Sequence, residues 1–152
     1  MNLHIGGTTA RDGWQILNIN PGPGIDHVGD FRDLGRFADR SFDNVYASHV
    51  LEHVAQAQVV PTLRGLHHIL RDGGNLFVSV PDLDVLCHTF ISPHASADVK
   101  WATMRMMYGG QVDQHDFHYV GFSEPLLANL LAQAGFTDVR RVASFGLFQD
   151  TS

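Results

Sequence analysis

The sequence of 152 residues predicts an α/β protein with a mostly parallel, Rossmann-like sheet and helices on both of its faces. Three observations predict this class. Residues 43–47 and residues 75–80 are apolar and rich in β-forming side chains, as buried parallel strands are. Between them, residues 56–70 carry apolar side chains at spacings of three and four, which indicates an amphipathic helix. The length fits a single domain that covers residues 1–152.

Three short strands are expected before the central one. β-forming or alternating side chains occupy residues 3–5, 15–20 and 25–31. The first of these strands ends at Gly6-Gly7, and the second ends at Asn20 before a Pro-Gly pair. Because only a handful of residues separate Gly7 from the second strand, the first crossover connection is too short for a full helix.

Two further helical regions and a strand are expected in the second half of the chain. The first helical region is interrupted at Ser92-Pro93. Ser123 is a typical N-cap residue for the next helix, and Gly135 is a typical residue to end it. The expected elements are a helical region over residues 83–107, a helix over residues 125–134 and a last strand over residues 136–142.

Composition and charge exclude several classes of function. The chain is 44% hydrophobic and 17% charged, as globular proteins are, and its net charge of −6 gives no general basic surface for nucleic acid. Cys87 is the single cysteine, so an internal disulfide framework is excluded. No apolar run is long enough to cross a bilayer. We therefore expect a soluble cytoplasmic protein without a nucleic-acid or membrane partner.

Polar side chains gather directly after the central strand, at Ser48, His49, Glu52 and His53. In open α/β sheets, ligands bind outside the carboxyl ends of the strands. These four residues are therefore placed for chemistry at that edge. The alternative is that they are only polar residues at the end of a strand.

The segment from His49 to His53 also spells H-x-x-E-H, the order of inverted zinc peptidases. A zinc site of this kind needs both imidazoles on one helical face and a third ligand downstream, for which Glu124 is available. However, His49 directly follows a strand-like run. The expectation is therefore that the chain holds no metal, with the zinc hydrolase kept as a remote alternative.

A polar loop after Gly109-Gly110 contains several titratable residues, among them His115, Asp116 and His118. Loops of this kind are frequent at active sites, although loop residues are often only solvated. For His118, both interpretations stay open.

Several motifs in order resemble the class I S-adenosylmethionine-dependent methyltransferases, and more narrowly their small bacterial members with an S-H-V-L-E-H central motif. The resemblance covers nearly the whole chain. The motifs that carry it are Leu3-His4-Ile5-Gly6-Gly7, Asp12-Gly13-Trp14, Leu17-Asn18-Ile19-Asn20, Gly29-Asp30, Ser48-His49-Val50-Leu51-Glu52-His53, Leu70-Arg71-Asp72-Gly73-Gly74, Ser79-Val80-Pro81-Asp82, Tyr108-Gly109-Gly110-Gln111, Phe117-His118 and Ala134-Gly135-Phe136.

This resemblance implies S-adenosylmethionine as the cofactor and assigns contacts to it by position. Gly6 and Gly7, next to Ile5, would lie under its methionine part, and Asn20 would contact the ribose. The remaining implied contacts are Asp30 and Phe31 at the adenine, and Ser48 and His49 beside the sulfonium.

The resemblance also implies methyl transfer to a small molecule, and the similarity to proteins of surface-polysaccharide pathways favours a sugar. Methyl transfer depends mainly on holding donor and acceptor in line, and a base is needed only for a hydroxyl or a protonated amine. The candidates for that base or for positioning the acceptor are His53, His118 and Asp82. A homo-oligomer is left open.

Two departures from the family pattern support a second hypothesis. Thr8 replaces the usual third glycine, and Asn20 stands where an acid usually binds both ribose hydroxyls. Loss of that charge-assisted contact would cost about 1–2 kcal/mol of binding free energy. The alternative function is therefore a catalytically degenerate module that keeps the methyltransferase fold.

Overall fold

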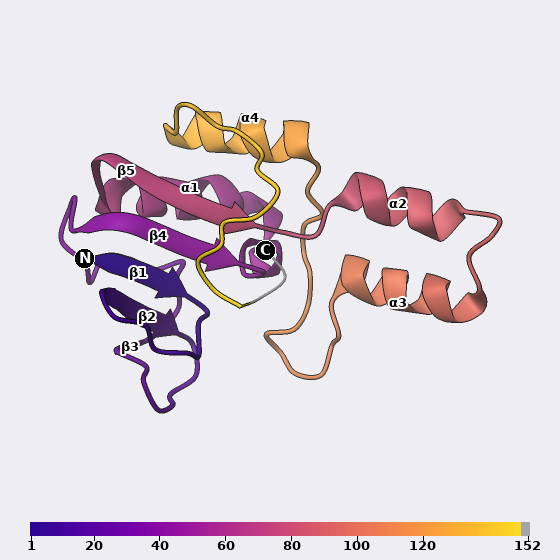
Figure 1. Ribbon diagram of the computed structural model, residues 1–152, viewed down its shortest axis with the longest axis horizontal. Coiled ribbons are helices and arrows are strands. Elements are labelled where there is room, and N and C mark those ends of the chain that lie inside the picture. Colours follow the sequence, from indigo (N-terminus) through magenta and orange to yellow (C-terminus); the bar gives the residue numbers. More distant parts are fainter. Residues whose placement is uncertain (150–152) are drawn as a thin grey trace.

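Five parallel strands form the sheet at the centre of the computed structural model, which describes residues 1–149 (Figure 1). The strand order is β3-β2-β1-β4-β5, and every neighbouring pair is parallel. All five carboxyl ends therefore meet at one edge. The strands are β1 (Asn2–Ile5), β2 (Trp14–Asn18), β3 (His27–Val28), β4 (Phe42–Ser48) and β5 (Leu70–Ser79). The predicted Rossmann-like class is confirmed, and the connection from β1 to β2 contains no helix.

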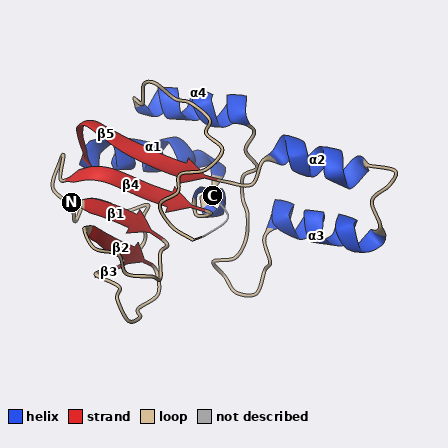
Figure 2. Ribbon diagram, viewed as in Figure 1, coloured by secondary structure: helices blue, strands red, loops and turns tan. Residues whose placement is uncertain are grey.

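The helices divide into two groups (Figure 2). The first group, α1 with α4, packs on one face of the sheet. The second group, α2 with α3, projects past the carboxyl edge of the strands. No helix within residues 1–149 has the length and apolar character that crossing a bilayer requires. The helices are α1 (Val59–Ile69), α2 (Leu83–Ile91), α3 (Ala97–Tyr108) and α4 (Glu124–Ala134), and two 3₁₀ turns, η1 (Leu51–His53) and η2 (Gln56–Gln58), precede α1.

The main core lies between the sheet and the helices α1 and α4. Leu3 of β1 and Val45 of β4 point to the same face and are fully buried there. Leu63 and Leu66 of α1 and Leu131 of α4 complete this cluster. Burial of an aliphatic side chain of this size contributes about 1.5–3 kcal/mol, so this face anchors β1 and β4 in the centre of the sheet.

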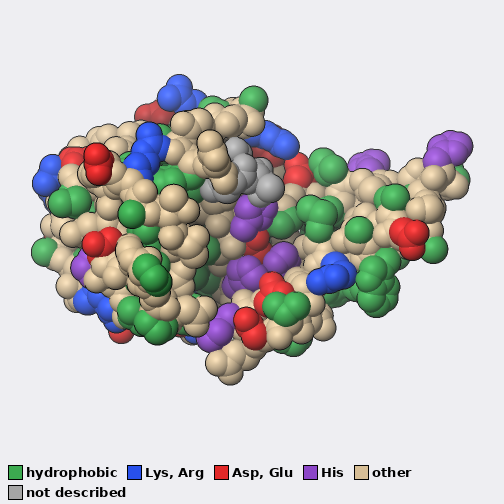
Figure 3. Space-filling view, turned by 60° about the horizontal axis from the view of Figure 1, so that its bottom comes forward, with side chains coloured by type: hydrophobic (Ala, Val, Ile, Leu, Met, Phe, Trp, Pro, Cys, Tyr) green, Lys and Arg blue, Asp and Glu red, His purple; other side chains and the backbone are tan. Residues whose placement is uncertain are grey.

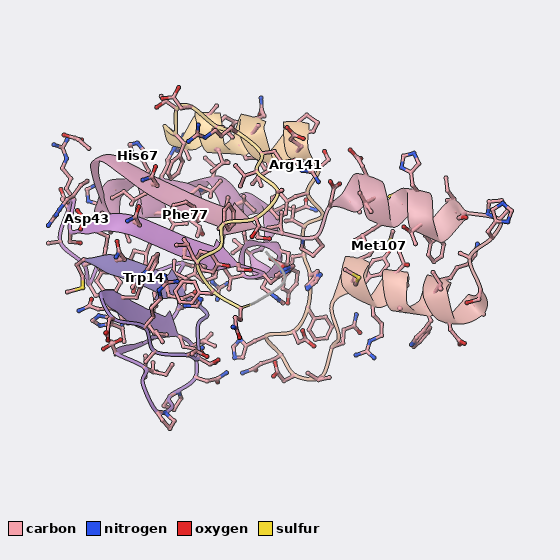
Figure 4. The ribbon with its side chains drawn as sticks, viewed as in Figure 1. Trp14, Asp43, His67, Phe77, Met107 and Arg141 are labelled. Atoms are coloured by element: carbon pink, nitrogen blue, oxygen red, sulfur yellow. The ribbon has the colours of Figure 1, made fainter. Side chains whose placement is uncertain are left out.

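The opposite face differs from the expectation of helices on both sides, because an aromatic segment covers it. Phe148 lies with its ring centroid 4.0 Å from that of His4 and 4.7 Å from that of Tyr46. Phe145 contacts Tyr46 and Phe77. Figure 4 shows Phe77 and Trp14 on the face that this segment crosses. Aromatic side chains at the centre of this face give the segment edge-to-face partners, so a helix is not needed to cover them.

Two strands are shorter than the sequence predicts. The second strand ends at Asn18, so the prediction of a strand to Asn20 is wrong by two residues. The third was expected over residues 25–31, but only His27 and Val28 pair with β2. At this edge of the sheet, the side chain of Asp26 accepts a hydrogen bond from the Ile16 nitrogen at 2.7 Å. A side chain thus takes a place that a strand residue would otherwise fill.

β5 begins earlier than predicted. Residues 71–74 were expected to separate helix from strand, yet Leu70 already pairs with Phe42 before a shift in register leads to the pair Asn44 and Asn75. Leu70 is 6% exposed, so its burial fixes the strand before the glycines. Gly73 has φ +74° in the resulting bulge.

The predicted last strand over residues 136–142 is wrong: within residues 1–149, no strand follows β5. To form a strand, these residues would have to lie against the edge of β5. Instead, an open cavity of about 1380 Å³ is lined by β5, α4 and residues 136–145. Phe136 packs on the core instead, and Arg141 forms ion pairs with Asp82 and Glu124. With these contacts, residues 136–142 do not pair with β5.

Candidate active site

The carboxyl ends of three central strands bring Gly6, Asn18 and Ser48 side by side. Ile5 pairs with Leu17 on one side and with Ala47 on the other, so the residues that follow them share one edge. Asn18 donates from Nδ2 to the Gly7 carbonyl oxygen at 3.0 Å and to that of Gly6 at 3.3 Å. The sequence interpretation assigned no role to Asn18, although an asparagine beside a glycine turn is a usable signal for one.

The glycine turn after β1 leaves no room for side chains. Gly6 has φ +76°, and a Cβ atom there would lie 2.6 Å from Cγ1 of Val50. A Cβ on Gly7 would overlap the imidazole of His4. Packing within the domain therefore requires glycine at both positions. Gly6 is exposed, so a ligand can approach its backbone closely, whereas Gly7 is buried. Ile5 is buried in the core, so it offers only its backbone to this edge.

The positions expected at the ribose and the adenine lie on the loops after β2 and β3. Asn20 is exposed, and its backbone nitrogen donates to Oδ1 of Asn18 at 2.9 Å. Asp30 accepts hydrogen bonds from Nε of Arg32 at 2.9 and 2.8 Å. The hydrogen bond from Arg32 lowers the pKa of Asp30. Phe31 is half-buried and packs against the core.

Ser48 and His49 close the edge at β4. The hydroxyl oxygen of Ser48 is buried and has no hydrogen-bond partner among residues 1–149. His49 has φ +52°, and its backbone nitrogen donates to the Ser79 carbonyl oxygen at 2.9 Å. A buried hydroxyl without a partner is costly, so a ligand atom at this position would relieve the cost.

The inverted zinc-peptidase geometry predicted by H-x-x-E-H is not formed. His49 lies in a left-handed conformation before η1, so His49 and His53 do not share a helical face. Glu124 begins α4, and its carboxylate pairs with Arg141. The remote alternative of a zinc hydrolase with this ligand set is therefore wrong.

Two of the three predicted catalytic residues meet in space. The ring centroids of His53 and His118 are 4.7 Å apart. The loop after α3 brings them together, because the Tyr119 nitrogen donates to the Glu52 carbonyl oxygen at 2.8 Å and the His118 nitrogen donates to the Tyr108 carbonyl oxygen at 3.1 Å. Figure 3 shows histidine side chains gathered between the body of the domain and the projecting helices.

Glu52 lies beside this pair and is 1% exposed. Its Oε1 atom is 3.3 Å from Nδ1 of His49, whereas its Oε2 atom has no partner within residues 1–149. Glu52, His53 and His118 each present a ligand atom within 4.8 Å of the others. A buried carboxylate and two imidazoles therefore form a compact polar cluster shortly after the carboxyl end of β4.

Asp82, the third predicted catalytic residue, is the N-cap of α2. Its Oδ1 atom accepts hydrogen bonds from the backbone nitrogens of Asp84 and Val85, at 3.0 and 3.4 Å. Its Oδ2 atom is 3.1 Å from Nη1 of Arg141. Both oxygens thus have structural partners, and Asp82 is not part of the Glu52, His53 and His118 cluster.

Comparison with known families identifies the domain. The family model described as "Methyltransferase domain" matches residues 9–141, most of the chain. The chain belongs to this methyltransferase domain family. Its fold is that of the class I S-adenosylmethionine-dependent methyltransferases. A search of curated protein sequences gave no significant match.

Three solved structures illustrate the likeness of the methyltransferase fold. A SAM-dependent methyltransferase of Archaeoglobus fulgidus is 19% identical with a TM-score of 0.59, covering 91% of this chain and 62% of its own. A Burkholderia thailandensis 1,6-didemethyltoxoflavin-N1-methyltransferase, with 1,6-didemethyltoxoflavin and S-adenosylhomocysteine bound, is 20% identical with a TM-score of 0.61, covering 91% and 61%. A chain of a Haloferax volcanii complex that contains the Trm112 methyltransferase activator is 18% identical with a TM-score of 0.56, covering 88% and 59%. The methyltransferase domain thus spans about three fifths of these chains.

Proposed function

We propose that this domain transfers a methyl group from S-adenosylmethionine to a hydroxyl of a small-molecule acceptor. The observation that carries the proposal is the edge where the Gly6-Gly7 turn, Asn18 and Ser48 meet. It combines the exposed backbone of Gly6 with a buried hydroxyl that has no partner within residues 1–149. These features fit a ligand with polar groups and a close approach to the main chain.

The residues present fit the cofactor. When bound, S-adenosylmethionine supplies a methyl group activated by its sulfonium. Gly6 offers exposed backbone without a side chain, Asn18 fixes the carbonyls of that turn, and Ser48 offers its hydroxyl. Asn20 and Asp30 stay our candidates for the ribose and the adenine. The contribution of the chain is mainly orientation of donor and acceptor.

A hydroxyl acceptor is supported by the two imidazoles beside this edge. Nδ1 of His53 lies 3.1 Å from the Phe117 carbonyl oxygen, and Nδ1 of His118 lies 2.8 Å from that of Met106. A carbonyl oxygen only accepts, so Nδ1 carries the proton in each neutral ring and Nε2 is left to accept one. Because a hydroxyl must lose its proton during methylation, we propose sugars as the first acceptors to screen.

Calorimetric titration with S-adenosylmethionine and S-adenosylhomocysteine tests the proposal. We expect binding in the micromolar range, about −8 kcal/mol. Ser48→Ala should weaken binding about 2- to 10-fold, because one hydrogen bond contributes about 0.5–1.5 kcal/mol. Ser123→Ala is the matched control, since the Ser123 side chain makes no capping hydrogen bond at α4.

A second variant separates the proposal from the degenerate module. Asn20→Asp restores an acid at the position expected for the ribose, and we expect it to raise cofactor affinity about 5- to 20-fold. If neither the native chain nor this variant binds either compound, the methyltransferase proposal is overturned in favour of the degenerate module.

A further inference from the structure

We propose that Glu52, His53 and His118 bind a divalent first-row transition-metal ion. Their ligand atoms already lie within 4.8 Å of one another. Tetrahedral bonds of about 2.0–2.2 Å would place such atoms roughly 3.3 Å apart. Small rotations of the three side chains would therefore close the site around an ion.

The hydrogen bonds of the two imidazoles leave the same nitrogen available in each. Nδ1 of His53 donates to the carbonyl oxygen of Phe117, and Nδ1 of His118 donates to that of Met106. In both rings the lone pair is then on Nε2. Metal-binding histidines usually donate their second nitrogen to a carbonyl or a carboxylate, which fixes the ring and its tautomer.

The carboxylate of Glu52 supplies an independent argument. Its side chain is 98% buried, with 2% of its surface exposed, and it comes from η1 directly before His53. Oε1 faces Nδ1 of His49, and Oε2 has no partner within residues 1–149. A buried carboxylate oxygen without a partner is costly. A cation between Oε2 and the two Nε2 atoms would remove that cost.

The donor set indicates the kind of ion. Two imidazoles and one carboxylate suit Zn²⁺, Fe²⁺, Co²⁺ or Mn²⁺, whereas Mg²⁺ and Ca²⁺ prefer oxygen ligands. Three protein ligands leave at least one coordination position open, as in catalytic zinc sites. This proposal departs from the sequence-based expectation that the chain holds no metal.

The position of the cluster suggests what the ion does. Glu52 and His53 lie in η1, shortly after the carboxyl end of β4, so the open coordination position can take the oxygen of an acceptor hydroxyl and lower its pKa. In the metal-bound protein, the ion then replaces the imidazoles as the group that activates the hydroxyl, and the proton of the hydroxyl passes to bulk water. This role rests on the proposed function, whereas metal binding itself does not.

Metal titration of the full chain, after dialysis against a chelator, tests the inference. We expect calorimetry to show one Zn²⁺ per chain with micromolar or tighter affinity, and Co²⁺ to give visible absorption bands of imidazole ligation. Glu52→Gln keeps the shape of the side chain, and His118→Asn changes a half-buried loop residue. Each should weaken Zn²⁺ binding at least tenfold. His94→Gln, which removes an exposed imidazole between α2 and α3, should leave it unchanged.

Two results would overturn the metal site: no saturable binding of Zn²⁺ or Co²⁺ by the folded chain, or equal Zn²⁺ affinity in His118→Asn and the native chain. Circular dichroism checks that each variant is folded. If Glu52→Gln does not fold, His118→Asn decides alone. Cofactor titration without metal is a separate measurement, so the failure of one proposal is distinguishable from the failure of the other.

Discussion

Gly6 combines two constraints at one residue, a positive φ of +76° and a close approach to Val50. We expect Gly6→Ala to lower the free energy of unfolding by about 1–3 kcal/mol, because the left-handed conformation and the contact both disfavour a side chain. It should also weaken binding of S-adenosylmethionine more than tenfold. Urea denaturation and calorimetry measure the two effects.

Gly73 provides a matched control, since its φ of +74° is nearly the same and a Cβ there would meet nothing within 4 Å. Gly73→Ala should lower the free energy of unfolding by about 1 kcal/mol, the contribution of the left-handed backbone conformation alone. It should leave cofactor affinity unchanged. Equal losses of stability in both variants would mean that the contact with Val50 contributes nothing.

Asp30, our candidate for the adenine contact, gives the stability of the fold a pH dependence through its contact with Arg32. Its hydrogen bond with Arg32 lowers its pKa below the ordinary value of about 3.9. Folding therefore favours the ionised form, so the pair stabilises the fold above about pH 4 and loses this contribution as the pH falls through the lowered pKa. We expect Asp30→Asn to cost at most about 1 kcal/mol at pH 6 and less at pH 3, as measured by urea denaturation.

The Arg32→Gln background is the control for this prediction. Without the guanidinium, Asp30→Asn should have the same effect on stability at both pH values. If the effect of Asp30→Asn on stability still differed between pH 6 and pH 3 in the Arg32→Gln background, another group would be lowering the pKa of Asp30.

α2 depends on its N-cap residue, because Asp82 caps two backbone nitrogens and contacts Arg141. We expect Asp82→Ala to lower the free energy of unfolding by about 1 kcal/mol, as the loss of an N-cap usually does. Asp82→Asn should retain most of that stability, since asparagine caps as well as aspartate. Thermal or urea denaturation provides the measurement.

The same pair of variants decides between a cap and a base. An asparagine cannot take up a proton, so methyl transfer would be lost in Asp82→Asn if Asp82 were the base. Normal activity in Asp82→Asn would leave His53 and His118 as the candidates from the sequence. Activity that is lost while stability is kept would return Asp82 to the site.

At the scale of the molecule, the segment that carries Phe145 and Phe148 closes the second face of the sheet (Figure 4). Phe148 also lies 5.1 Å from Trp14, between ring centroids. We expect Phe148→Ala to lower the free energy of unfolding by about 1–3 kcal/mol, less than for a fully buried phenylalanine because this ring is half-buried. Tryptophan fluorescence should shift to longer wavelength, since Trp14 becomes more hydrated.

Val142→Ala is the matched control on the same segment, because Val142 is 47% exposed. It should change stability by less than about 0.5 kcal/mol. If Phe148→Ala behaved like this control, the aromatic cover would not contribute to the stability of the sheet.

Local patterns determined the parallel sheet, the helices α1 and α4 and the short connection after β1. Val45 and Tyr46 lie in a run that is buried on both faces, and Leu63 and Leu66 repeat at helical spacing, so neighbours in sequence suffice to specify these elements. The glycine turn was predictable for the same reason, because Gly6 and Gly7 stand directly after a strand. The short length of the edge strand β3 was not predictable in this way. There the side chain of Asp26, and not a strand carbonyl, accepts the hydrogen bond from the Ile16 nitrogen of β2.

Only the tertiary structure decided which polar residues lie together. His53 follows β4, whereas His118 lies on a loop that returns after α2 and α3 and is held by the hydrogen bond from Tyr119 to Glu52. The sequence offered Asp82 as an equal candidate, and its capping contacts separate it from the pair. Residue types determine what chemistry is available, but distances between residues far apart in the chain depend on the packing of the whole fold. The cluster of Glu52, His53 and His118 could therefore be seen only once that packing was known.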